Sequence, residues 1–125
     1  MQTKKKILII EDDVFLSKLL ARQLEDSGFE TMLAANGKEG LAKAVAQPAD
    51  LVLLDVMLPD IDGFDVLKQV KAEGASKAAP VIIISNLGQI EDVAQGRKLG
   101  AVDYIIKSDL SLDELVTKVR THLGG

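Results

Sequence analysis

Four short apolar runs of the sequence each end in polar residues that could do chemistry. In chain order these residues are Glu11, Asp12 and Asp13 after ILII (7–10), Asp55 after LVLL (51–54), Ser85 at the end of VIIIS (81–85), and Lys107 after VDYII (102–106). Carboxylates, a hydroxyl and an ammonium group together suit phosphoryl transfer to an aspartate. In that chemistry the carboxylate is the nucleophile, while a cation and a lysine neutralise the phosphoryl oxygens and the hydroxyl donates a hydrogen bond to one of them.

Charge balance indicates what else such a site needs. Two carboxylates about 4 Å apart repel by roughly 4 kcal/mol at an effective dielectric constant near 20. Asp12, Asp55 and Glu11 therefore cannot all stay ionised together without positive charge nearby. Lys107 supplies one charge, and a hard divalent cation with oxygen ligands supplies the rest. A site of two carboxylates and waters suits Mg²⁺ better than Ca²⁺, and no His or Cys lies nearby in the sequence to favour zinc.

The elements that must position these residues alternate along the chain. Apolar runs predict strands, and segments of helical period follow them. The predicted strands are 7–10, 29–34, 51–54, 81–85 and 102–106, and the predicted helices are 14–28, 36–46 with its Asn36 cap, 64–74, 89–99, and a last helix that the capping box SLDE (111–114) opens. Such alternation predicts an α/β fold, a parallel sheet with helices on both sides. All strands then end at one edge, where open α/β sheets bind ligands.

Composition sets the broad class. The chain has 125 residues, 47% of them apolar and 27% charged, which predicts one globular domain over residues 1–125. A net charge of −4 argues against direct nucleic-acid binding or an anionic-membrane surface. No apolar run approaches the roughly 20 residues that span a bilayer, and there is no cysteine. We therefore expect a cytoplasmic protein without membrane association.

Four motifs in register, ILIIEDD, LVLLDVMLPDIDG, VIIIS and GAVDYIIK, resemble the response-regulator receiver domain of two-component signalling across essentially the whole chain. The resemblance implies the flavodoxin-like (βα)5 sandwich with strand order 2-1-3-4-5. It also implies a set of residue roles: Asp55 as phosphoacceptor, Glu11 and Asp12 as the acidic pair with Asp12 a direct Mg²⁺ ligand, the backbone carbonyl of Met57 as another ligand, Ser85 as the phosphate-sensing hydroxyl, Lys107 as the paired lysine, and Tyr104 as the switch aromatic.

The resemblance also implies partners. A histidine kinase or phosphotransfer protein would phosphorylate Asp55, and the surface formed by 89–99, 102–106 and the last helix would signal to an output protein or domain. That domain could follow the end of the chain, and Lys118 and Arg120 could join a homodimer through the same surface. Apart from Mg²⁺-dependent self-phosphorylation and self-dephosphorylation, no enzymatic activity is expected.

Three positions depart from the family pattern. Asn86 follows Ser85, where the family favours a small residue, and could narrow access for the phosphodonor. Ser108 follows Lys107 in place of the usual proline, so we expect a trans bond there, since a cis bond before Ser would cost about 3–4 kcal/mol. Asp13 is a third acid in sequence, and we expect it to cap the first helix.

Other polar residues have structural explanations. We expect Asp60 and Asp62 to be turn residues rather than ligands. His122, the only histidine, is expected to be a favourable charge near the end of the last helix rather than a phosphorelay residue.

Three alternatives to a phosphorylated switch make different demands on the sequence. A haloacid-dehalogenase-type phosphatase needs a second acid two residues after the nucleophile, where this chain has Met57. A flavodoxin-like FMN carrier needs a phosphate-binding loop after the first strand, where this chain is acidic, and aromatics over the ring, whereas it has no Trp. A pseudo-receiver, a constitutive protein-interaction module that is never phosphorylated, stays open because of Asn86 and Ser108.

Overall fold

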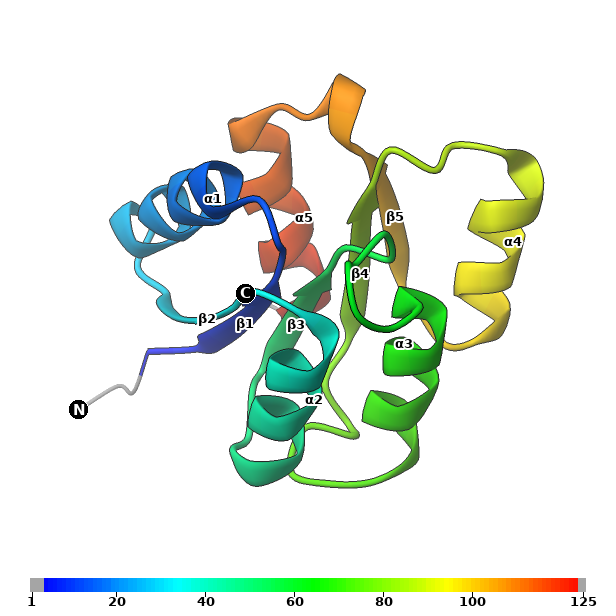
Figure 1. Cartoon of the computed structure of the whole chain (residues 1–125). Coiled ribbons are helices and arrows are strands. Elements are labelled where there is room, and N and C mark those ends of the chain that lie inside the picture. The colour runs from blue at the N-terminus through cyan, green and yellow to red at the C-terminus, as the bar shows by residue number, and fades with distance from the viewer. Residues whose placement is uncertain (1–3, 124–125) are drawn as a thin grey trace.

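Five parallel strands form one sheet of order β2-β1-β3-β4-β5 in the computed structural model, which describes residues 4–123 (Figure 1). The strands are β1 (Lys6–Ile10), β2 (Glu30–Ala34), β3 (Leu51–Leu54), β4 (Val81–Ser85) and β5 (Asp103–Ile106). The helices are α1 (Val14–Asp26), α2 (Gly37–Ala46), α3 (Gly63–Ala72), α4 (Ile90–Lys98) and α5 (Leu112–Leu123), with a short 3-10 helix, η1 (Lys107–Asp109), after β5. The predicted flavodoxin-like fold and strand order are confirmed.

Two apolar cores lie on opposite faces of the sheet. Successive side chains of a strand point to opposite faces, so Ile7 and Ile9 of β1 pack with α1 and α5, while Leu8 and Ile10 pack with α2 and α3 (Figure 1). The three middle strands are buried along nearly their whole length because both of their faces are covered. The half-polar β2 lies at an edge, as its sequence predicts.

Helix ends follow local chemistry. α1 ends at Asp26, two residues before the predicted end, because Ser27 caps it and Gly28 takes a φ of +99° that glycine adopts without strain. The Asn36 side chain accepts a hydrogen bond from the Glu39 amide at the start of α2, as predicted. The Glu39 carboxylate lies 3.1 Å from Lys43 Nζ, one turn further along the helix. α3 ends at Ala72 rather than at residue 74.

Helix α1 presents part of its apolar surface to solvent. Leu19 is 43% exposed, whereas Leu20 and Leu24 of the same helix are buried. Phe15, one helical turn before Leu19, is 85% exposed. Among residues 4–123, no helix is long and apolar enough to cross a membrane.

Candidate functional site

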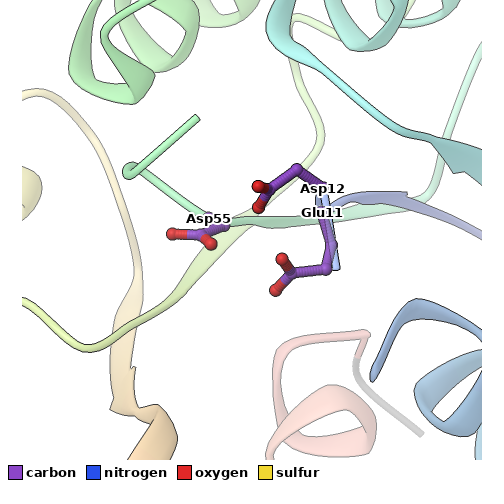
Figure 2. Close-up of side chains that lie close together, drawn as sticks. All are labelled: Glu11, Asp12 and Asp55. Carbon is purple, nitrogen blue, oxygen red and sulfur yellow. The ribbon is translucent and has the colours of Figure 1, made fainter. Parts of the chain in front are cut away.

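Three carboxylates meet where β1 and β3 end. These strands pair in register with Ile10 beside Leu54, and the Asp55 amide donates to the Ile10 carbonyl at 3.0 Å, so the residues that follow each strand lie together. One carboxylate oxygen from each of Glu11, Asp12 and Asp55 lies within 4.8 Å of the other two (Figure 2). Glu11 and Asp55 are buried, and Asp12 is exposed. The cluster therefore has two buried acids and one at its mouth.

Lys107 reaches this cluster from the end of β5. Its Nζ lies 2.7 Å from Asp55 Oδ2 and 2.8 Å from Glu11 Oε1. Burial lowers the pKa of Lys107, but hydrogen bonds to Asp55 and then to Glu11 outweigh this effect and hold the pKa above its ordinary value. Lys107 is therefore a fixed positive charge between two carboxylates.

One lysine does not balance three acids. Burial raises the pKa of Glu11 from an ordinary 4.5 to about 7, and the nearby Asp55 charge adds to the rise. Hydrogen bonds from Lys107 and from the Asp13 amide, which donates to Glu11 Oε2 at 3.0 Å, oppose the rise without cancelling it. The site carries more negative charge than its surroundings neutralise.

A hard divalent cation fits this donor set. The oxygens of Glu11, Asp12 and Asp55 are carboxylate oxygens, and no His or Cys belongs to this cluster. Hard cations such as Mg²⁺ take oxygen ligands and keep several waters, for which the exposed Asp12 leaves access. A cation there would also lower the cost of ionising Glu11.

The predicted hydroxyl and aromatic residues lie on β4 and β5. Ser85 is fully buried at the end of β4, two residues past Ile83, which is the partner of Leu54 in the sheet. The Ser85 hydroxyl oxygen accepts from the Leu87 amide at 3.3 Å, and the Tyr104 hydroxyl donates to the Leu87 carbonyl. Burial, with the charges of Asp92 and Asp55, raises the pKa of Tyr104. Tyr104 thus contacts the loop that follows Ser85.

The loop between β3 and α3 is closed at its base. Asp55 Oδ1 accepts from the Met57 amide at 2.8 Å, and Met57 forms an antiparallel bridge with Asp62. Asp62 is the N-cap of α3, since its side chain accepts from the Phe64 amide. The backbone of Met57 therefore lies beside the Asp55 carboxylate, although its side chain is 53% exposed.

Asp60 does more than turn the chain. Its two carboxylate oxygens accept from the Gly37 amide at 2.8 Å and the Lys38 amide at 2.9 Å, at the start of α2. This contact joins residues more than 20 positions apart, so no local pattern in the sequence predicts it. The hydrogen bond from Lys38, followed by that from Gly37, holds the pKa of Asp60 below its ordinary value despite some desolvation.

The departures from the family pattern also have structural outcomes. Asp13 is the N-cap of α1, as predicted, and accepts from the Phe15 and Leu16 amides. No peptide bond in residues 4–123 is cis, so the Lys107–Ser108 bond is trans as predicted. Lys107 still reaches Asp55 from this backbone. Asn86 is exposed.

An ion-pair network joins the last two helices to β5. Asp103 of β5 lies 3.2 Å from Lys118 and 3.1 Å from His122 of α5, and 4.0 Å from Arg97 of α4. Burial would raise the pKa of Asp103, but hydrogen bonds from His122, the Tyr104 amide and Lys118 lower it below its ordinary value. This network could not be found from local sequence patterns, because its four members come from three different elements.

Comparisons with known proteins agree with the geometry. The model of the response regulator receiver domain matches residues 7–120. The chain is 41% identical over 118 residues to a probable transcriptional regulatory protein, SilR, of Salmonella typhimurium, and 38% identical over 118 residues to the transcriptional regulatory protein CusR of Escherichia coli K12. Each alignment covers 94% of this chain but only 50% and 51% of those proteins, so the chain spans about half the length of these curated relatives.

A solved structure of a receiver domain also resembles this chain. The CheY-like receiver domain protein of Methanospirillum hungatei superposes with a TM-score of 0.91 at 29% identity, covering 98% of this chain and 95% of that one. The chain therefore belongs to the response-regulator receiver domain family, the receiver part of two-component signalling proteins.

Proposed function

We propose that this chain is a phosphorylation-controlled signalling switch that accepts a phosphoryl group on Asp55. The observation that carries the proposal is the position of the Lys107 ammonium, within 2.8 Å of both Asp55 and Glu11, while Asp12 lies in the same carboxylate cluster. A buried aspartate beside a fixed cation and two further acids has the parts that phosphoryl transfer requires.

The reaction uses Asp55 as nucleophile. A carboxylate oxygen of Asp55 forms a bond to phosphorus while the bond from phosphorus to a histidine nitrogen of the donor breaks, and the electron pair of that bond stays on the histidine. Lys107 then neutralises charge on the phosphoryl group, and the Ser85 hydroxyl turns to donate to a phosphoryl oxygen. The hydrogen bond that the Ser85 oxygen accepts from the Leu87 amide is long, at 3.3 Å, so losing this bond in the turn would cost little.

We further propose that Asp12, Asp55 and the Met57 carbonyl hold Mg²⁺, with Glu11 acting indirectly. When bound, Mg²⁺ supplies positive charge that offsets the acids and the phosphoryl oxygens. Glu11 already engages both of its oxygens, one with Lys107 and one with the Asp13 amide, which favours an indirect role. Asp12 is exposed and free to take the direct role.

Signalling would follow from the contacts of Tyr104. Movement of Ser85 toward a phosphoryl group changes the loop that includes Leu87, and the Tyr104 hydroxyl is bonded to the carbonyl of that residue. Tyr104 directly follows Asp103, whose ion pairs reach α4 and α5. The proposed output is therefore a change in the α4-β5-α5 surface.

The proposed partners are a sensor histidine kinase or phosphotransfer protein as donor, and an output protein or domain as target. The relatives SilR and CusR are described as transcriptional regulatory proteins, and this chain covers about half of each. A DNA-binding output in the rest of a longer protein is consistent with those descriptions. A homodimer through α4-β5-α5 would have to accommodate Lys118 and Arg120, which contact Asp103 and the Ser27 carbonyl within one chain.

The test is phosphorylation by a small donor. Purified protein is incubated with Mg²⁺ and acetyl phosphate, and its intact mass is measured beside that of Asp55→Asn and of Asp65→Asn, a matched change at an exposed position of α3. We expect one phosphoryl mass increment in the wild type and in Asp65→Asn, and none in Asp55→Asn or in EDTA. No increment in the wild type would favour the pseudo-receiver, a constitutive protein-interaction module.

A further inference from the structure

We propose that Asp60 is a positioning residue for the phosphoacceptor site: it ties the loop between β3 and α3 to the start of α2 and so keeps the Met57 backbone in place beside Asp55. This inference rests on the proposed function, because the proposed function is what assigns the Met57 carbonyl as a ligand of Mg²⁺.

The tie is made by two hydrogen bonds to one carboxylate. The Gly37 and Lys38 amides are the first two of α2 and have no acceptor within their own helix. Asp60 Oδ1 accepts from Gly37 at 2.8 Å and Asp60 Oδ2 accepts from Lys38 at 2.9 Å. The negative carboxylate also lies at the positive end of the α2 dipole. Hydrogen bonds to an ionised group are stronger than neutral ones, so one side chain closes this end of the loop.

Packing leaves the loop little freedom at the same point. A Cβ added at Gly37 would lie 3.2 Å from Asp60 Oδ1 and 3.2 Å from Ile61 Cβ, so the loop rests directly on the backbone of α2. At the base of the loop, the Gly63 amide donates to the Val56 carbonyl at 3.0 Å, and a Cβ at Gly63 would lie 2.1 Å from Val56 Cα. The segment from Met57 to Asp62 is thus held at its base and again at Asp60 and Ile61.

Helix α2 is a firm anchor because it packs closely on β1. A Cβ added at Gly40 of α2 would lie 2.6 Å from Ile10 Cδ1, at the end of the strand that leads to Glu11. Asp60 therefore connects the loop after β3 to a helix that packs on β1, the strand that leads to Glu11 and Asp12. Strands β1 and β3 thus lead to the residues on the two sides of the proposed cation site.

A matched set of variants separates this tie from the capping of α2. Asp60→Ala removes both hydrogen bonds, and Asp60→Asn removes the charge but keeps one acceptor oxygen. Asn36→Ala removes a different cap of the same helix, the bond to the Glu39 amide, without touching the loop. Asp65→Asn removes a nearby exposed charge at the start of α3.

Two measurements are made on each variant. Mg²⁺ affinity is measured by calorimetry, and amide hydrogen exchange is measured in EDTA. For Asp60→Ala we expect Mg²⁺ affinity to fall about tenfold, the usual scale for losing a partner that orients a metal ligand, with Asp60→Asn between it and the wild type. Asn36→Ala and Asp65→Asn leave the hydrogen bonds of Asp60 in place, so these variants should bind Mg²⁺ within about twofold of the wild type. In EDTA the Met57 amide should exchange faster in Asp60→Ala than in Asn36→Ala.

The outcomes distinguish this inference from the proposed function. Wild-type affinity in Asp60→Ala, or an equal loss in Asn36→Ala, overturns the positioning role while leaving Mg²⁺ binding intact. Absence of Mg²⁺ binding in the wild type overturns the proposed function and this inference with it.

Discussion

Replacing Glu11 by Gln should raise the free energy of unfolding of the metal-free protein at neutral pH and leave this free energy unchanged in acid. Glu11 is 3% exposed, and its pKa is raised to about 7 from an ordinary 4.5. The folded state therefore holds a proton that the unfolded state releases between these values. Stability linked to this group is complete below pH 4.5 and falls as the pH rises toward 7.

The structure sets the size of this effect. At 1.36 kcal/mol per pKa unit, a pKa of about 7 corresponds to a loss of about 3 kcal/mol by pH 8. Gln has no charge to desolvate, and its oxygen can still accept from the Asp13 amide or from Lys107. The variant should therefore gain up to about 3 kcal/mol over the wild type at pH 8 and about nothing at pH 4.

The assay is urea unfolding in EDTA at several pH values between 4 and 8, with Glu73→Gln as the control at an exposed position. The free energy of unfolding of Glu11→Gln should rise above that of the wild type as the pH increases, whereas Glu73→Gln should follow the wild type. A difference that does not change with pH would refute the reasoning. So would a variant that is less stable than the wild type at pH 8.

Three other predictions follow from the site and its loop. Asp55→Asn should raise the melting temperature more in EDTA than in Mg²⁺, because it relieves charge repulsion that a cation would otherwise relieve; equal effects in both buffers would argue against a shared metal site. Self-dephosphorylation should be slow, because Met57 and Leu87, two residues past Asp55 and Ser85, cannot orient a water; loss of the phosphorylated form within seconds in Mg²⁺ buffer would contradict this. Gly63→Ala should lower the free energy of unfolding by more than 2 kcal/mol, roughly the scale of other strained substitutions, since its Cβ would lie 2.1 Å from Val56 Cα; a urea midpoint equal to that of the wild type would show that the loop gives way easily.

Most of the fold could be predicted because its signals are local. Apolar runs such as LVLL (51–54) predict buried strands, and Asn36 and Asp13 predict helix starts that the structure contains. The meeting of Glu11, Asp55 and Lys107 was also predictable, because parallel strands end at one edge of the sheet. The predicted ends of helices and strands were less accurate, since the true ends depend on caps and glycine turns within one or two residues.

The features that could not be predicted from the sequence depend on tertiary contacts. Asp60 looks like an ordinary turn acid until the fold brings α2 within reach of its carboxylate. Lys118 and His122 converge on Asp103 only because α5 packs beside β5. Helical periodicity places Phe15 and Leu19 on one side of α1, but it does not tell which apolar residues the neighbouring elements leave uncovered.

Mapping the phosphoryl group to one residue tests the account most directly. Protein treated with Mg²⁺ and acetyl phosphate is reduced with borohydride, which converts an acyl phosphate of aspartate to homoserine, and its peptides are sequenced by mass spectrometry. We expect homoserine at position 55 in the wild type and none there after reaction in EDTA. Label at another carboxylate, or wild-type labelling that does not depend on Mg²⁺, would contradict it.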